Sequence, residues 1–212
     1  MISIIDYKAG NLTSVERALK KLSLSCRITH DPKLVLQSDR VIFPGVGAAG
    51  EAMKALRATG MDEALKAFFR SGRPLLGICL GTQVILDFSQ ENQASCLGIL
   101  PGEVIRFPNP HFDEQGKPLK IPHMGWNQVE WNRDHPMIRA IPTQSTFYFV
   151  HSYYPVPREE KHILGRTHYG FSFPSALACR NLVALQFHPE KSGSPGLALL
   201  KAFSEWGGQD AD

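Results

Sequence analysis

The chain has 212 residues, 43% of them hydrophobic and 20% charged, so it can bury a full core as one domain or as two small ones. Its net charge is +3, and its Lys and Arg residues do not form a dense run, which argues against a nucleic-acid partner. No apolar stretch approaches the ~18 residues that a membrane helix needs and no basic segment opens the chain, so we expect a cytoplasmic protein without membrane contact.

Strand and helix patterns alternate through the first ~90 residues. Strands are predicted at 3–6, 25–29, 40–43 and 75–78. A turn is predicted at 10–11 and helices at about 13–22, 32–36, 48–59, 61–70 and 80–88, with Thr13 or Ser14 capping the first helix. Such alternation implies right-handed crossovers and a parallel sheet.

The second half of the chain has a different pattern. Residues 97–131 contain short extended pieces broken by Pro and Gly, which predicts antiparallel additions and surface loops. Further strands are predicted at 146–154, 163–169, 176–180 and 182–187, and a helix at 195–206. The expected fold is therefore α/β: an open, mostly parallel sheet flanked by helices, with antiparallel additions. It would form a single domain over 1–206, followed by a frayed tail at 207–212.

The segment Gly77-Ile78-Cys79-Leu80-Gly81 has the pattern G-x-C-x-G at a predicted strand-to-helix junction. This pattern is typical of a nucleophile on a sharp turn, whose flanks approach neighbouring backbone too closely for a Cβ. A cysteine at a helix N-terminus is also favoured as the thiolate. By itself the pattern equally permits a buried structural cysteine beside a glycine bend.

A thiolate nucleophile needs a base and a group that orients the base. His188-Pro189-Glu190 follows a predicted strand, and Pro189 restricts the backbone on both sides, so the Glu190 carboxylate could hold the His188 imidazole. Such a tripeptide is usually a surface turn. Together with the cysteine elbow at Gly77–Gly81, however, it indicates an active-site base and its orienting group. For the oxyanion we expect the Leu80 N–H and the glycine-rich segment 44–47, with Gly45 and Val46 at its centre.

The other cysteines do not form a metal or redox motif. Cys26, Cys96 and Cys179 lie far from each other and from Cys79, and no C-x-x-C pair occurs. We therefore expect three structural thiols in a reducing compartment, with no metal and no cofactor.

These motifs together resemble the class I glutamine amidotransferases, and the resemblance extends from end to end. Its more particular signs are Gly10-Asn11, Pro44-Gly45-Val46-Gly47, the cysteine elbow, Ile121-Pro122-His123-Met124-Gly125-Trp126-Asn127, Tyr148-Phe149-Val150-His151-Ser152-Tyr153 and Gln186-Phe187-His188-Pro189-Glu190-Lys191-Ser192. The resemblance implies glutamine hydrolysis with Cys79 as nucleophile, His188 as general base and then acid, and Glu190 as the orienting group. It also implies that Gly47, Gln83 and the backbone of His151 and Ser152 bind glutamine.

Within this family the chain is similar to the glutaminase subunits of imidazole glycerol phosphate synthases. That resemblance implies a heterodimer with a (β/α)8 cyclase subunit, which receives ammonia through a tunnel and makes imidazole glycerol phosphate and AICAR in histidine biosynthesis. Asn11, Trp126 and Lys191 would face the partner, although Trp126 could instead be a half-buried core aromatic. Thr82 stands where the family often has Met, away from the proposed chemistry.

Three alternative functions remain open at this point. The chain could serve another amidotransferase, such as a paralogue for surface-sugar amination. It could be a non-enzymatic regulatory or scaffolding subunit, although intact Cys79, His188 and Glu190 argue against that. It could also be a cysteine peptidase or a γ-glutamyl hydrolase on the same fold.

Overall fold

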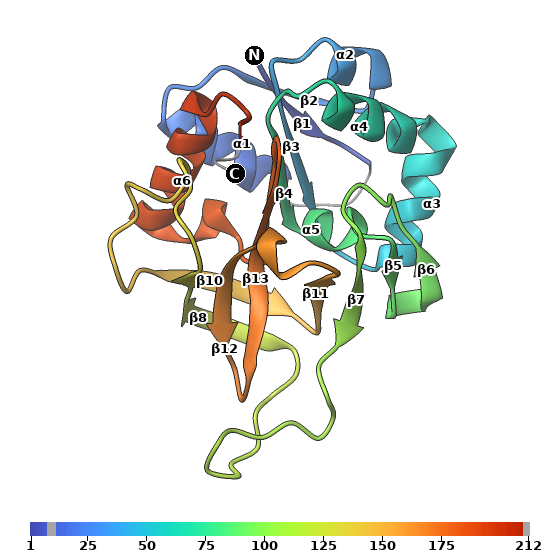
Figure 1. Ribbon diagram of the computed structural model, residues 1–212. Helices are drawn as coiled ribbons and strands as arrows, with labels where there is room; N and C mark the ends of the chain where they lie inside the picture. Colours follow the sequence, from blue (N-terminus) through green and yellow to red (C-terminus); the bar gives the residue numbers. More distant parts are fainter. Residues whose placement is uncertain (8–11, 210–212) are drawn as a thin grey trace.

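The computed structural model describes residues 1–7 and 12–209, and its centre is an eight-stranded sheet (Figure 1). The strand order is β2-β1-β3-β4-β14-β13-β12-β9. Five neighbouring strands are parallel: β2 (Cys26–Thr29), β1 (Ile2–Ile5), β3 (Arg40–Gly45), β4 (Leu75–Cys79) and β14 (Leu182–Leu185). The antiparallel strands β13 (Ser172–Cys179), β12 (Ile163–His168) and β9 (Glu130–Trp131) extend one edge. The predicted fold class is confirmed.

Six α-helices occur in the described part of the chain and cover the two faces of this sheet. They are α1 (Leu12–Lys21), α2 (Pro32–Leu36), α3 (Ala49–Thr59), α4 (Met61–Arg70), α5 (Leu80–Val84) and α6 (Gly193–Glu205). Apolar side chains of α1 and α6 pack in one core cluster, and those of α2 to α5 pack in a second cluster on the other face (Figure 1). Each face of the sheet is therefore buried, which explains why its parallel strands read as continuous apolar runs.

Two smaller sheets hold the additions. One has the order β11-β7-β5-β6 and is built from β11 (Tyr153–Pro157), β7 (Gly102–Arg106), β5 (Phe88–Ser89) and β6 (Ala94–Ser95). The other pairs β10 (Thr146–His151) with β8 (His123–Gln128). Three 3₁₀ turns complete the elements: η1 (Glu91–Gln93), η2 (Glu160–His162) and η3 (Pro189–Lys191). The pairs β10–β8, β11–β7 and β5–β6 are antiparallel, whereas β5 and β7 are parallel.

Two predicted elements differ from the structure. The helix after Cys79 ends at Val84 instead of continuing to residue 88, because amides of residues 97–100 bind the carbonyls of residues 84–86. The predicted strand 146–154 is two strands in different sheets, since Ser152 lies between β10 and β11 and its carbonyl accepts the Phe107 N–H. The break at Ser152 places this residue at the cavity described below.

Other boundaries are closer to expectation. Helix α2 spans the predicted residues and is capped by Asp31, whose carboxylate accepts the Lys33 N–H at 2.8 Å. Helix α1 begins at Leu12, so Thr13 and Ser14 lie inside its first turn and the predicted cap is wrong. The predicted turn at 10–11 lies outside the described residues.

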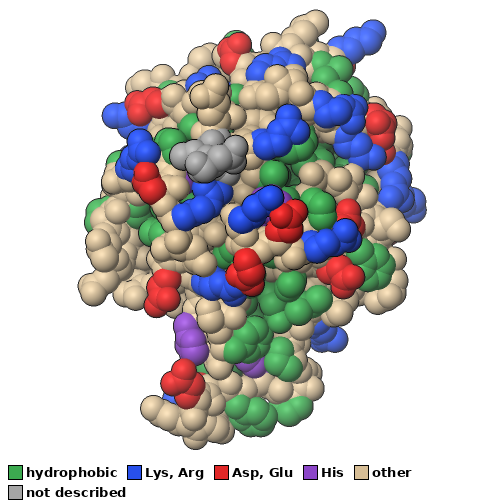
Figure 2. All heavy atoms as spheres, viewed as in Figure 1, with side chains coloured by type: hydrophobic (Ala, Val, Ile, Leu, Met, Phe, Trp, Pro, Cys, Tyr) green, Lys and Arg blue, Asp and Glu red, His purple; other side chains and the backbone are tan. Residues whose placement is uncertain are grey.

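The face of the molecule that is seen in Figure 1 carries both charged and hydrophobic side chains. Figure 2 shows Lys and Arg side chains interspersed with Asp and Glu over the upper part of this face, whereas hydrophobic side chains gather toward its lower end.

In the tail, the indole of Trp206 donates a hydrogen bond to the Gln209 carbonyl at 2.8 Å. None of the helices formed by residues 1–7 and 12–209 is long and apolar enough to cross a membrane.

Candidate active site

Cys79 ends β4 and directly precedes α5 in a strained backbone conformation. Its φ of 54° is in the left-handed region, which is costly for a residue with a side chain. A Cβ on Gly81 would overlap the carbonyl oxygen of Phe43 on the neighbouring strand, and a Cβ on Gly77 would come within 3.3 Å of Ala184 Cβ. The glycines therefore permit the close packing that the sequence pattern predicts for a nucleophile elbow.

His188 and Glu190 follow β14, the strand that pairs with β4. Nδ1 of His188 lies 2.8 Å from Oε1 of Glu190, and both side chains are only 2% exposed. The His188 N–H donates to the Tyr148 carbonyl at 2.9 Å, which fixes the backbone of this segment against β10. The second ring nitrogen, Nε2, is buried without a hydrogen-bond partner among the described residues. It is therefore available to a reacting group.

The electrostatic environment of His188 favours the imidazolium. Burial alone would lower the pKa of His188, but the hydrogen bond with Glu190 and the charge interactions with Cys79 and Glu190 outweigh it and raise this pKa to about 10. A proton is thus retained on the ring at neutral pH, next to a sulfur that can carry the negative charge. This is the arrangement needed for a proton donor beside a nucleophile.

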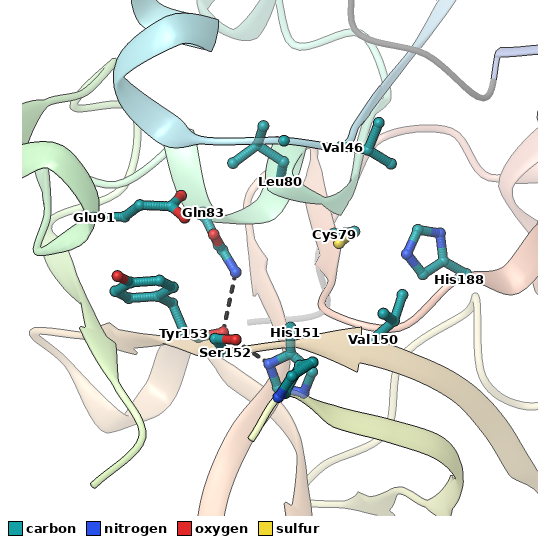
Figure 3. A pocket seen from close by; sticks show the side chains of 12 residues that line it. Val46, Cys79, Leu80, Gln83, Glu91, Val150, His151, Ser152, Tyr153 and His188 are labelled. Atoms are coloured by element: carbon teal, nitrogen blue, oxygen red, sulfur yellow. Dashed lines mark hydrogen bonds between the residues drawn. The ribbon is translucent and has the colours of Figure 1, made fainter. Parts of the chain in front are cut away.

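The cavity at Cys79 has a volume of about 310 Å³. In Figure 3, Val46 and Leu80 lie on one side of it, and His151 and Ser152 lie on the opposite side. Gly45 is paired with Cys79 in the ladder between β3 and β4, which brings the segment 44–47 next to the nucleophile. The predicted oxyanion residues are therefore assembled around the predicted nucleophile.

Gln83 lies one turn after Cys79 and lines the same cavity. Its amide nitrogen donates to the Tyr153 carbonyl at 3.0 Å and to Oε1 of Gln186 at 3.1 Å. The amide nitrogen of Gln186 in turn lies 3.8 Å from Cys79 Sγ. Gln186 is fully buried and was not predicted as a site residue, and its amide N–H donates toward the sulfur.

His151 belongs to a chain of buried, neutral imidazoles. Its Nδ1 is 2.7 Å from the Tyr153 carbonyl, which can only accept, so Nε2 of His151 accepts a hydrogen bond from Nδ1 of His123 at 3.0 Å. Burial is the main cause that lowers the pKa of His123 to about 4 and that of His151 to about 3. The Tyr153 carbonyl therefore fixes Gln83 and His151 together, on the wall opposite Val46.

Four cavity residues were not predicted as site residues. Glu91, Pro122, Val150 and Tyr153 line the wall around Gln83 and His151. Glu91 is the only carboxylate among the described residues that line this cavity, and its Oε2 accepts the Ala49 N–H at 2.8 Å. The Glu91 carboxylate can accept further hydrogen bonds, and its negative charge suits the ammonium group of a ligand. Glu91 follows a short strand in an irregular segment, so no local pattern in the sequence marks it.

Two of the residues expected to face a partner, Trp126 and Lys191, contact the ring of Tyr148. Trp126 is 57% exposed and packs edge-on against Tyr148, with ring centroids 6.1 Å apart. Nζ of Lys191 lies 5.7 Å from the centre of the same Tyr148 ring, close enough for a cation–π contact. Asn11, the third expected interface residue, lies outside the described residues.

Comparison with known proteins adds independent information. Residues 3–205 match the family described as glutamine amidotransferase class-I. The chain is 50% identical over 212 residues to the imidazole glycerol phosphate synthase subunit HisH of Nitratidesulfovibrio vulgaris strain DP4, covering 100% of this chain and 99% of that protein. It is 49% identical over 210 residues to the subunit of the same name from Nitrosococcus oceani, covering 98% of each.

Solved structures give the same fold at lower sequence identity. PurLQS from Thermotoga maritima matches with a TM-score of 0.72 at 14% identity, covering 96% of this chain and 97% of that one. A structure described as a glutamine amidotransferase matches with a TM-score of 0.70 at 20% identity, covering 96% and 98%. At these identities the likeness concerns the fold alone.

Proposed function

The chain belongs to the class I glutamine amidotransferases and, among them, to the HisH subunits of imidazole glycerol phosphate synthase, and we propose that its cavity hydrolyses glutamine through Cys79, His188 and Glu190. As a HisH subunit it is a glutamine amidotransferase of histidine biosynthesis. The observation that carries the proposed mechanism is the buried arrangement of these three side chains at the strained turn after β4.

In this mechanism Cys79 Sγ attacks the side-chain carbonyl carbon of glutamine, forming a carbon–sulfur bond. The carbon–nitrogen bond then breaks as the proton held by His188 passes to the leaving nitrogen, releasing ammonia and leaving a thioester. His188, now neutral, takes a proton from water as the water oxygen attacks the thioester carbon. The carbon–sulfur bond then breaks, which releases glutamate and restores the Cys79 thiolate beside the His188 imidazolium. Glu190 keeps the imidazole oriented through the 2.8 Å contact during both steps.

The tetrahedral intermediates of both steps carry negative charge on oxygen. We assign its stabilisation to the backbone N–H groups of Leu80 and Val46, which come from the two segments that meet at Cys79. Gly45 and Gly47 give the second segment the conformational freedom that this role requires, and Gly47 already has a φ of 97°.

The rest of the cavity is suited to the amino-acid end of glutamine. The carboxylate of Glu91 can pair with the α-ammonium group, whereas Gln83 and the backbone at Gly47, His151 and Ser152 offer hydrogen bonds to the α-carboxylate and α-ammonium groups. The negative charge of Glu91 thus lies opposite the positive charge of the α-ammonium group of glutamine. This arrangement selects a free amino acid over an internal peptide residue.

We propose that ammonia leaves through a tunnel into a (β/α)8 cyclase subunit, with which the chain forms a cytoplasmic heterodimer. The names of the relatives imply an assembled synthase. The exposed cluster of Trp126, Tyr148 and Lys191 supports a partner surface, because large aromatics and a cation are frequent anchors at protein interfaces. The single domain at 1–206 and the frayed tail at 207–212 remain part of this proposal.

The proposal is tested by supplying the complex with either glutamine or ammonia. Cys79→Ala and His188→Ala should each abolish glutamine-dependent synthesis while leaving ammonia-dependent synthesis largely intact, because only the ammonia supply is removed. Cys96→Ala is the matched control, since Cys96 is a half-buried free thiol that does not line the cavity and contacts the Ala94 carbonyl. Near wild-type glutaminase turnover in either active-site variant would contradict the triad assignment.

Release of ammonia from glutamine also separates this function from the alternatives. Turnover of free glutamine excludes a purely regulatory subunit, and absence of activity on γ-glutamyl peptides and proteins excludes a peptidase. Labelling of Cys79 by a glutamine-like diazo ketone should accompany turnover and should be absent from Cys79→Ala. Stimulation by a histidine-pathway cyclase, and not by synthases for sugar amination, identifies the partner.

A further inference from the structure

A buried hydroxyl lies behind the segment that we assign to the oxyanion hole. Tyr7 follows β1, is 4% exposed, and packs its ring edge-on against Phe43 with centroids 5.6 Å apart. Its Oη has no hydrogen-bond partner among the described residues. A Cβ added to Gly45 would overlap this oxygen, so the hydroxyl sits directly against the Gly45 backbone. A buried hydroxyl without a partner is costly, and such groups call for an explanation.

The segment beside Tyr7 separates two hollows. Val46 and Gly47 line the cavity of Cys79, of about 310 Å³, and they also line a second hollow of about 290 Å³. Tyr7 lines the second hollow and is not among the residues that line the first. The segment therefore forms a wall between the two hollows, with space on either side in which a peptide group can turn.

Peptide geometry links the two sides of this wall. In a trans peptide the N–H and the C=O point in opposite directions, so a Val46 N–H directed at the cavity of Cys79 requires a Gly45 carbonyl directed away from it. We propose that the Tyr7 hydroxyl donates a hydrogen bond to this Gly45 carbonyl in the catalytic state. Tyr7 is then a positioning residue for the oxyanion hole, an inference that rests on the proposed glutaminase function.

The chemistry of Tyr7 is suited to this role. Burial, and to a smaller extent the negative charge of Cys79, raise the pKa of Tyr7 above its ordinary value, so the hydroxyl keeps its proton at neutral pH and can act as a donor. Among the described residues, which include Gly45, Oη has no hydrogen-bond partner, so it does not bind the Gly45 carbonyl here. The hydrogen bond would thus be gained only when the peptide turns, which favours the state with the Val46 N–H at the cavity.

The test uses the complex with the cyclase partner and its nucleotide substrate, and compares wild type with Tyr7→Phe. Loss of one hydrogen bond present only in the catalytic state should lower the glutaminase kcat about 3- to 10-fold. The KM for glutamine should change by about twofold or less, because Tyr7 does not line the glutamine cavity. The melting temperature should stay the same or rise, since the variant removes only a buried hydroxyl that has no hydrogen-bond partner among the described residues.

Tyr154→Phe is the matched control, because Tyr154 is also buried and packs among aromatics away from the cavity. Its kcat should equal that of wild type. A Tyr7→Phe kcat equal to wild type would overturn the inference, and so would a lower melting temperature with a raised KM and an unchanged kcat, which describes a purely structural role.

A direct observation complements the kinetics. In a structure of the Cys79→Ala complex with glutamine bound, Tyr7 Oη should lie about 3 Å from the Gly45 carbonyl oxygen. A glutamine-bound structure in which Oη still has no partner would overturn the inference while leaving the proposed function intact. If the wild-type complex released no ammonia from glutamine, the proposed function would fail first, and this inference with it.

Discussion

Glu190→Gln tests how the imidazole of His188 is held. The variant keeps the shape of the side chain but replaces a carboxylate, 2.8 Å from Nδ1, by a neutral amide. Both side chains are 2% exposed, so water does not screen or replace the contact. A charge-assisted hydrogen bond of this kind contributes about 1.5–3 kcal/mol, which predicts a fall in the glutaminase kcat of roughly 10- to 100-fold. The loss should be smaller than for His188→Ala, because the base itself remains.

The same variant should change the pH profile. In the wild type the charges of Cys79 and Glu190 contribute to a His188 pKa of about 10, so the imidazolium persists well above neutral pH. Removal of the Glu190 charge lowers this pKa, and the imidazolium is then lost at lower pH. The alkaline limb of kcat/KM for ammonia release should therefore move to lower pH.

Glu160→Gln is the control for this experiment. It makes the same chemical change in an exposed ion pair with Arg166, so the profile and kcat should match wild type. The reasoning is refuted if Glu190→Gln retains full kcat, or if its alkaline limb coincides with that of the wild type.

Three further predictions address the partner surface, the oxyanion donor and the buried imidazoles. Trp126→Ala should weaken cyclase binding by ~2 kcal/mol or more in a titration, whereas unchanged affinity with a lowered melting temperature would assign Trp126 to core packing. Val46→Pro removes one proposed donor and should lower stimulated glutaminase kcat ~10²–10³-fold, so full activity in a folded variant would exclude this donor. In urea titrations, the unfolding free energy should fall by up to about 3 kcal/mol per residue between pH 6.5 and 4, because His123 and His151 bind protons more weakly when folded. His123→Gln should reduce this loss of unfolding free energy. An unchanged dependence of the unfolding free energy on pH in this variant would contradict the prediction.

The residues that we propose for catalysis could be predicted because their signals in the sequence are local. The turn at Cys79 needs glycines two positions away on each side, and the glycines stand there in the sequence. His188 and Glu190 are two positions apart, with Pro189 limiting their backbone. Each pattern could therefore be recognised without knowledge of the rest of the fold.

Residues whose roles depend on distant packing were missed. Gln186 approaches Cys79 because β14 pairs with β4, which joins segments about a hundred positions apart. Glu91 reaches the cavity through an irregular turn with no periodic pattern. The helix after Cys79 was predicted too long for the same reason, since residues 97–100 take the carbonyls that would have continued it. Long-range hydrogen bonding overrode local propensity in these cases.

The pairing of β8 with β10 connects the proposed partner surface at Trp126, Tyr148 and Lys191 with the cavity. Trp126 is paired with Tyr148, and two steps further along the same ladder Met124, which is 61% exposed, is paired with Val150 of the cavity wall. The ladder ends with His123 opposite His151, joined by their 3.0 Å hydrogen bond. A partner that binds the exposed side chains of β8 therefore acts on a strand bonded directly to a wall of the glutamine cavity. The two strands are paired along their full length, so backbone hydrogen bonds connect the exposed side of β8 with the cavity wall.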